Sequence, residues 1–318
     1  MLIKMKKSAQ LIQSNNDECV MMNKKLDANC NSRISNHEVI SMPFSSVSEA
    51  ISWGAKMLLE SIGDASLAER ESKWLLESSA VSAGRDPLFL NQPDLTARVS
   101  SVFRSHIARR SRGEPLSYVI GEASFRGIDL FVTSDVLIPR PETEQLVDEI
   151  LKLIPKAAEW QILDQGTGSG AIAIAVALER KLVHVTGIDK STSAIDIAKK
   201  NVKRYGLENR IDIIEADIFP KEGLFDMIIA NLPYVPDKVD LPKEISEWEP
   251  VLALRGGPTG MEVINRSIEL SNKFLKPNGL LIYEIGEEQE SGFREHWQNR
   301  FEFKKDLNNK IRFMIDRG

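Results

Sequence analysis

The stretch "LDQGTGSGAIAIAVAL", residues 163–178, gives the strongest indication of the fold class of this chain. A short apolar run ends at Asp164, three alternating glycines follow, and an apolar helix starts at Ala171. Glycines at this place permit a tight turn and a close approach of a ligand to the N-terminus of a helix. The pattern predicts a strand–loop–helix unit that binds a ligand. Two alternatives stay open: a purely structural glycine turn, and the degenerate dinucleotide fingerprint Gly-x-Gly-x-x-Ala, which "GTGSGA" also fits.

Short apolar runs alternate with helical patterns from Ile162 to the end of the chain. Such alternation is typical of parallel strands that are joined by crossover helices. We therefore predict an α/β fold with a doubly wound, mostly parallel sheet. The predicted strands are "QILDQG", "HVTGID", "RIDIIEAD", "FDMIIAN", "LLIYEIG" and "IRFMID".

Residues 43–122 have the pattern of a small helical domain. Two capping boxes, "SVSE" at Ser46–Glu49 and "SLAE" at Ser66–Glu69, each open an apolar-periodic run. A third helix is predicted to begin at Asp94. We therefore expect a helical domain that precedes the sheet domain.

The remaining segments complete the predicted organisation. Residues 1–42 are polar, rich in Asn, Ser and Lys, and lack any sustained period, so we expect a disordered extension. Residues 123–135 alternate loosely, with Gly127 as a turn, and predict a hairpin linker. The sheet domain then occupies residues 136–318.

Composition excludes several classes of function. The net charge of −5, from 41 basic and 46 acidic residues, argues against binding of long nucleic acid by phosphate neutralisation. Both cysteines, Cys19 and Cys30, precede the predicted domains, which excludes a Cys nucleophile or a Cys-ligated zinc within them. The four histidines show no metal-ligand spacing, so we expect no metal. No run approaches the ~20 apolar residues of a membrane span, and no signal peptide is readable, so we expect a cytoplasmic protein.

Acidic residues select among ligands for the glycine loop. Asp164 heads the loop, where a pyrophosphate gains nothing from a carboxylate but a cationic group is tolerated. Asp189 ends the next strand, 25 residues later (189 − 164), where an acid binds the two hydroxyls of a ribose. Asp217 and Ile218 follow the third strand, where adenine would lie, although plain core packing is an equal alternative for Ile218. A ligand with ribose, adenine and a zwitterionic tail but no phosphate is S-adenosylmethionine.

The stretch "MIIANLPYVP", residues 227–236, follows the fourth strand at the same sheet edge. An amide nitrogen is a poor nucleophile because its lone pair is delocalised, and two acceptors that hold both N–H bonds can turn that lone pair toward a methyl donor. The Asn231 side-chain oxygen and the Leu232 carbonyl are candidate acceptors, and Tyr234 is placed to lie flat on the planar group. Pro233 restricts Leu232 to extended geometry. A plain turn after a strand is the alternative.

With these motifs the chain resembles the release factor glutamine methyltransferases over residues 43–318. The resemblance implies a seven-stranded, Rossmann-like, S-adenosylmethionine-dependent methyltransferase domain and an N-terminal helical domain that helps to hold the substrate protein. It also implies methylation of the side-chain nitrogen (N5) of Gln in the Gly-Gly-Gln motif of peptide chain release factors. The motifs that carry it, in order, are "RGEPLSYVIG", "VLIPRPETE", "DQGTGSG", "GID", "NLPYVP", "EPVLALRGGPTGMEVI" and "NGLLIYEIGEEQ".

The resemblance also assigns roles to single residues. It implies catalysis by Asn231 and Tyr234, and binding of the substrate Gln by these two together with Leu232 and Pro233. Leu232 departs from the family, which usually has Pro there; the carbonyl is kept but the fixed φ is lost. The implied cofactor-binding residues are Gly166, Thr167, Gly168, Ser169, Gly170, Asp189, Ile218 and Asn231.

Four other functions stay open at this point. An adenine-N6 methyltransferase would need a basic groove, which the acidic balance disfavours. Glutamine methylation of a ribosomal protein would use the same chemistry. A nicotinamide-dependent oxidoreductase would use "GTGSGA" but have no need of "NLPY", and a non-catalytic partner of the translation machinery would need neither Asn231 nor Tyr234. We expect a monomer.

Overall fold

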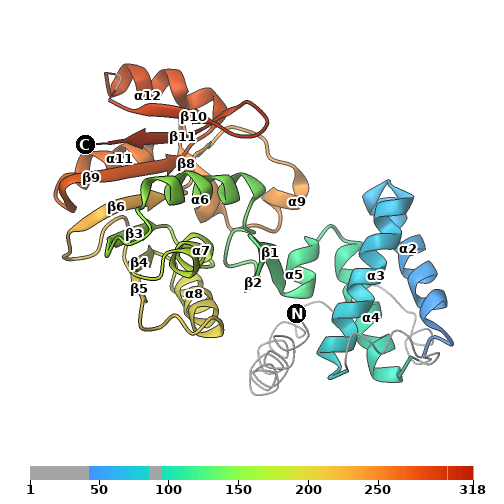
Figure 1. Ribbon diagram of the computed structural model, residues 1–318. Helices are drawn as coiled ribbons and strands as arrows, with labels where there is room; N and C mark the ends of the chain where they lie inside the picture. The colour runs from blue at the N-terminus through green and yellow to red at the C-terminus, as the bar shows by residue number, and fades with distance from the viewer. Residues whose placement is uncertain (1–42, 86–94, 299, 318) are drawn as a thin grey trace. The chain divides into compact units, whose positions relative to one another are not determined.

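The computed structural model describes residues 43–85, 95–298 and 300–317, whose helices and strands are shown in Figure 1. The expected disorder of residues 1–42 lies outside this described part of the chain.

The chain divides into two compact units, Met1–Gly113 and Glu114–Gly318. This boundary falls earlier than the one expected after residue 122. Tyr118 explains the difference, because its buried ring packs in a cluster with Ala194 of the second unit. The short helix α5 (Leu116–Ile120), which carries Tyr118, therefore belongs to the larger unit.

The described part of the first unit consists of the helices α2 (Val47–Ile62), α3 (Ala65–Ser82) and α4 (Ala97–Arg110). The hydroxyl of Ser46 accepts a hydrogen bond from the amide of Glu49 at 3.1 Å, which confirms the predicted cap of α2. The second predicted capping box is wrong. Asp64 caps α3 by accepting from the amide of Leu67 at 2.8 Å, and Ser66 lies inside the first turn. An ionised carboxylate is the stronger acceptor, so the helix begins earlier than expected.

Close packing of the three helices depends on one small residue. A Cβ atom at Gly54 would lie 2.3 Å from the Ser72 hydroxyl and 2.8 Å from the ring of Phe103, so a larger residue would push α2 away from α3 and α4. The predicted start of the third helix at Asp94 lies outside the described residues, and α4 follows its cap Thr96.

A hairpin of β1 (Glu122–Phe125) and β2 (Ile128–Phe131) follows α5. Its turn residues Arg126 and Gly127 have φ angles of 48° and 73°, as in a type I′ turn. The predicted turn at Gly127 is present for this reason. The hairpin is anchored in the second unit, because the Asn201 side-chain oxygen accepts the amide of Phe131 at 2.7 Å.

The larger unit is built on a seven-stranded sheet in the order β10-β11-β9-β6-β3-β4-β5. Only β11 runs against the other strands of this sheet, which confirms the doubly wound, mostly parallel prediction. The apolar runs do not indicate β10, whose sequence "EFKK" has a single apolar residue and which lies at the sheet edge. The strands are β3 (Gln161–Gln165), β4 (His184–Asp189), β5 (Ile211–Glu215), β6 (Phe225–Ala230), β9 (Leu275–Glu284), β10 (Glu302–Lys305) and β11 (Ile311–Asp316).

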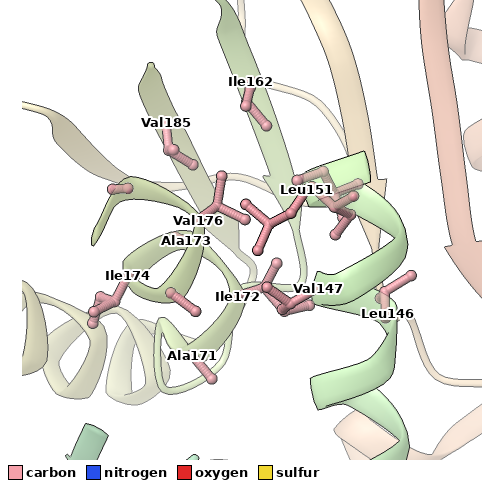
Figure 2. Close-up of a cluster of buried hydrophobic side chains, with 14 of the residues drawn as sticks. Leu146, Val147, Leu151, Ile162, Ala171, Ile172, Ala173, Ile174, Val176 and Val185 are labelled. Atoms are coloured by element: carbon pink, nitrogen blue, oxygen red, sulfur yellow. The ribbon is translucent and has the colours of Figure 1, made fainter. Parts of the chain in front are cut away.

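Helices cover both faces of the sheet, because alternate side chains of each strand point to opposite faces. Ile162 packs with α6 (Pro141–Leu153), α7 (Ala171–Glu179) and α8 (Thr192–Arg204). The next residue, Leu163, packs on the other face with α11 (Glu262–Ser271) and α12 (Glu290–His296). Figure 2 shows the first cluster, in which side chains of α6 and α7 lie over Ile162 and Val185.

The strand order reverses between β3 and β6, because β4 and β5 continue on one side of β3 and β6 lies on the other. In open α/β sheets, ligands bind beyond the carboxyl ends of the strands at such a reversal. Smaller elements complete this edge of the unit: β7 (Val235–Pro236), α9 (Lys243–Ser246), α10 (Val251–Leu254), β8 (Arg255–Gly257) and the 3-10 turn η3 (Glu287–Gln289).

Candidate active site

A cavity lies beyond the carboxyl ends of the strands next to this reversal. Two of the predicted site residues, Gly170 and Tyr234, are not in its lining. Gly170 instead caps α7 with φ at 81°, and Tyr234 contacts the cluster around Glu284 that is described below. The predicted residues that line the cavity are Gly166, Thr167, Gly168, Ser169, Asp189, Ile218, Asn231, Leu232 and Pro233.

The glycine loop is shaped by backbone conformations that only glycine adopts without strain. Gly166 and Gly168 have φ angles of 65° and 54°. Between them, the amide of Thr167 donates to the carbonyl of Ile188 at 2.8 Å, which ties the loop to the end of β4. A Cβ atom at Gly166 would also lie 3.2 Å from a methyl group of Leu232. The loop is therefore held close to both β4 and the segment after β6.

Asp189 is fixed at the end of β4 by two backbone amides. Its Oδ2 accepts from Gly168 at 3.0 Å and its Oδ1 accepts from Ser191 at 2.9 Å. Each carboxylate oxygen has a second lone pair that can accept from a ligand. The Asp189 carboxylate is thus positioned to accept hydrogen bonds from a pair of hydroxyls.

Asp164 lies behind the glycine loop and is fully buried. Its Oδ2 accepts from the hydroxyl of Thr167 at 2.7 Å, while its Oδ1 has no hydrogen-bond partner among the described residues. Burial raises the pKa of this carboxyl to about 7, against the opposing effect of the Thr167 hydroxyl and the Ala173 amide. Asp164 therefore acts on the cavity through Thr167, which lines it.

Ile218 is positioned by a residue that sequence reasoning missed. The side-chain nitrogen of the buried Gln165 donates to the carbonyl of Ile218, and its oxygen accepts from the hydroxyl of Ser267 at 2.6 Å. That hydroxyl also contacts the Tyr283 hydroxyl at 2.8 Å. Gln165 lies in the motif "DQGTGSG", but a Gln at the end of a predicted strand does not by itself indicate a contact with Ile218.

Asn231 belongs to a buried hydrogen-bond network. Its side-chain nitrogen donates to the Thr143 hydroxyl at 2.9 Å, and that hydroxyl donates to Glu284 Oε2 at 2.8 Å. The Tyr234 hydroxyl donates to Glu284 Oε1 at 3.2 Å. Sequence reasoning missed Thr143 and Glu284, although both lie inside the motifs "VLIPRPETE" and "NGLLIYEIGEEQ".

The same network keeps Tyr234 neutral. Burial and the negative charge of Glu284 both raise the pKa of the Tyr234 phenol. Burial also raises the pKa of Glu284 to about 7, and the hydrogen bonds from Thr143 and Tyr234 oppose this rise. The Tyr234 hydroxyl is therefore a hydrogen-bond donor to Glu284 and not a base.

The backbone of the "NLPYVP" loop is held from outside by the "RGGPTG" segment. A Cβ atom at Gly256 would lie 2.4 Å from the carbonyl oxygen of Pro233, so only glycine leaves room for the loop. The Gln289 side chain donates to the carbonyl of Tyr234 at 2.9 Å. Leu232, where the resemblance leads us to expect Pro, is 5% exposed and packs in the core on the α11 face of the sheet. These contacts hold the loop where a second proline is missing.

One wall of the cavity is closed by an ion pair. Arg140, just before α6, lines the cavity and pairs with Glu249, whose side chain is 2% exposed. Glu249 also accepts from the amide of Ile138 at 3.4 Å. The pair therefore joins the "IPRPETE" segment to the segment that leads into α10.

The charges that line the cavity disfavour a phosphate ligand. Three carboxylates, Asp135, Asp189 and Asp217, and two cations, Lys190 and Arg140, line the cavity. Arg140 is paired with Glu249 and Asp217 with Arg266, which leaves two carboxylates and one cation. Within the described ranges, no group of His, Cys, Asp and Glu residues could hold a metal ion. None of the helices in these ranges is long and apolar enough to cross a membrane.

Comparisons with known proteins match both units. Residues 49–121 match the family described as "PrmC N-terminal domain", and residues 156–313 match "Methyltransferase domain". The release factor glutamine methyltransferase of Geobacter sulfurreducens is 38% identical over 224 residues, which cover 69% of this chain and 77% of the relative. The same-named protein of Koribacter versatilis is 39% identical and covers 68% and 79%. That of Bacillus anthracis is 32% identical over 284 residues, which cover 85% and 98%.

Proposed function

The chain belongs to the family of release factor glutamine methyltransferases, and we propose that it methylates the side-chain nitrogen (N5) of the Gln in the Gly-Gly-Gln motif of peptide chain release factors. It is an S-adenosylmethionine-dependent methyltransferase by its domain and its relatives. The observation that carries the proposal is the orientation of Asn231, which lines the cavity and whose side-chain nitrogen is taken by Thr143. The Asn231 oxygen is then the atom that remains for a substrate donor.

The residues of the cavity fit S-adenosylmethionine. Its acidic lining suits a ligand with a sulfonium and an ammonium group and no phosphate. Asp189, which is held by two amides, would accept the ribose hydroxyls, and the glycine loop would lie against the amino acid tail. Ile218 would contact the adenine ring. When bound, the cofactor supplies a methyl group that is activated by its positively charged sulfur.

The chain's own residues would prepare the substrate nitrogen. The Asn231 oxygen and the Leu232 carbonyl would accept its two N–H bonds, which turns the lone pair away from the amide plane. The Tyr234 ring would lie on the carboxamide, with its hydroxyl held by Glu284. Orientation and proximity then supply most of the rate, because the methyl group is already activated. We also propose that the N-terminal helical domain, residues 43–122, helps to hold the release factor.

The test is a methyl-transfer assay with the full chain and labelled S-adenosylmethionine. Parallel reactions contain a release factor, a mixture of ribosomal proteins, or a DNA or RNA oligonucleotide. We expect one added methyl group on the Gly-Gly-Gln glutamine, located by mass spectrometry, and none on the nucleic acids. Label on nucleic acid alone, or on a ribosomal glutamine alone, would overturn the proposed substrate. We further propose that the protein acts as a cytoplasmic monomer, which its elution volume in gel filtration would test.

A further inference from the structure

Two buried residues stand behind Asn231 and connect it to the sheet. Thr143 comes from the first turn of α6 and is 4% exposed, and Glu284 ends β9 and is 1% exposed. The hydrogen bonds run from Asn231 to Thr143 at 2.9 Å and from Thr143 to Glu284 at 2.8 Å. Of these two residues, only Thr143 lines the cavity.

The direction of these two hydrogen bonds follows from the donors that are available. An ionised carboxylate only accepts hydrogen bonds, and a hydroxyl has a single proton. The Thr143 proton is therefore used on Glu284, and the Thr143 oxygen accepts from a donor on its other side. The only donor of the Asn231 side chain is its NH2 group. An ionised Glu284 thus turns the nitrogen of Asn231 toward Thr143 and leaves its oxygen for the substrate.

Hydrogen bonds that run in the opposite direction would turn the side-chain amide of Asn231 the other way. A protonated Glu284 can donate to Thr143, whose own proton then turns toward Asn231. Asn231 could then accept this proton with its oxygen and present its NH2 group to the cavity. The substrate nitrogen also carries two N–H donors, so two donors would then face each other without an acceptor.

We propose that Thr143 and Glu284 are positioning residues that keep Asn231 turned as a hydrogen-bond acceptor toward the substrate amide. This inference rests on the proposed function, because it explains how the acceptor in that scheme is oriented. Glu284 also receives a hydrogen bond from Tyr234, and the charged groups that face it are Glu142 on α6 and Arg312 on β11. Arg312 favours the ionised carboxylate, while burial and Glu142 favour the protonated form.

Three variants of the full chain separate orientation from packing. Thr143→Val keeps the shape of Thr143 but removes its hydroxyl, and Thr143→Ser keeps the hydroxyl. Glu284→Gln leaves one side-chain oxygen as an acceptor, where two carboxylate oxygens now accept from Thr143 and Tyr234. We expect kcat for a release factor to fall about 10- to 100-fold in Thr143→Val and Glu284→Gln, and to stay within about 3-fold in Thr143→Ser. Affinity for S-adenosylhomocysteine, measured by calorimetry, should stay within about 3-fold in all three.

The pH profile gives a second readout that packing alone would not change. The ionised form of Glu284 is the productive one, so kcat of the wild type should rise as pH increases from 6 to 8.5. In Glu284→Gln this rise should be lost. A wild-type profile that Glu284→Gln leaves unchanged would overturn the proposal.

A third readout needs no substrate. In the full chain labelled with [15N]asparagine, the side-chain NH2 resonance of Asn231 is identified by its absence from Asn231→Ala. We expect it to move with pH between 6 and 8.5 in the wild type and in Thr143→Ser, but not in Thr143→Val or Glu284→Gln. If the wild type methylates no release factor, the proposed function fails and this resonance still decides the orientation. Identical resonances in Thr143→Val and Thr143→Ser, at every pH, would overturn the positioning role.

Discussion

The carbonyl oxygen of Tyr234 lies so close to Gly260 that a Cβ atom there would be only 2.1 Å from it. Gly260 also has a φ of 76°, in the left-handed region. The carbonyl belongs to the loop that carries Asn231, and it accepts from Gln289 Nε2, which would lie 2.8 Å from the same Cβ atom. Glycine at position 260 therefore leaves the room that the loop carrying Asn231 needs.

Gly260→Ala should displace this loop. A Cβ atom cannot remain 2.1 Å from a backbone oxygen, so the Tyr234 carbonyl has to move. A shift of about 1 Å in a reacting group costs on the order of 100-fold in rate, and we expect a loss of kcat of that size. The matched control is Gly206→Ala in the same unit, where φ is 64° but nothing lies within 4 Å of the added atom. It should cost about 1 kcal/mol of stability and leave kcat unchanged. Equal kcat in the two variants would show that the loop does not depend on Gly260.

Asn231→Ala should abolish methyl transfer while it leaves most of the cofactor affinity. The variant loses one of the two proposed acceptors for the substrate nitrogen, but the glycine loop and Asp189 are untouched. We expect kcat to fall on the order of 100-fold or more, and the Kd for S-adenosylhomocysteine to rise by less than about 10-fold. Single-turnover transfer and calorimetry measure the two quantities. Asn209→Ala, in an exposed turn, is the control and should change neither. Near-normal turnover of Asn231→Ala would rule out the two-acceptor scheme.

Most strands of the sheet and part of the site could be predicted from the sequence, because their signals are local. A buried strand reads as a short apolar run, and the glycine loop, Asp189 and Asn231 stand where such runs end. The strand β10 was not predicted, because an edge strand with charged residues has no apolar run. The fold class could thus be read from the order of the runs alone.

The positioning network could not be read in the same way, because only the folded topology assembles it. Thr143 lies 88 residues from Asn231 and 141 residues from Glu284 along the chain. A Thr in the first turn of a helix and a Glu at the end of a strand both have ordinary structural explanations. The packing of Leu232 is of the same kind, since its neighbour Gly166 is close only in space.

Asp189→Ala should weaken cofactor binding without a selective effect on turnover at saturation. The variant removes the proposed acceptor for the ribose hydroxyls and the acceptor of the Gly168 amide. Charge-assisted hydrogen bonds of this kind contribute about 1.5–3 kcal/mol, and we expect a loss of that size in the binding free energy measured by calorimetry. The control is Asp212→Ala on β5, which removes an equal charge from a side chain that is 60% exposed and outside the cavity lining. The same loss in both variants would indicate a general charge effect and contradict the ribose contact.

Asp164 gives the larger unit a stability that depends on pH. Its carboxyl has a pKa of about 7 in the folded chain and an ordinary value of 3.8, because burial disfavours the charged form. Between these values the folded state keeps a proton that the unfolded state has lost. The contribution of Asp164 to the free energy of unfolding therefore falls as pH rises from about 4 to about 7, and the loss persists above pH 7.

Asp164→Asn should remove this part of the pH dependence. Asn keeps an oxygen that can accept from Thr167, and it removes the ionisable group whose burial raises the pKa of Asp164. We compare the free energy of unfolding of the variant with that of the wild type at each pH. We expect the difference in favour of the variant to be larger at pH 8 than at pH 5 by on the order of 1–4 kcal/mol. Urea unfolding at the two pH values measures the difference, with Asp196→Asn, an exposed acid on α8, as the control. Glu284 also has a raised pKa, so the wild type and the variant share its contribution and the comparison isolates Asp164. If Asp164→Asn and Asp196→Asn respond alike to pH, the buried carboxyl does not set the stability of the loop.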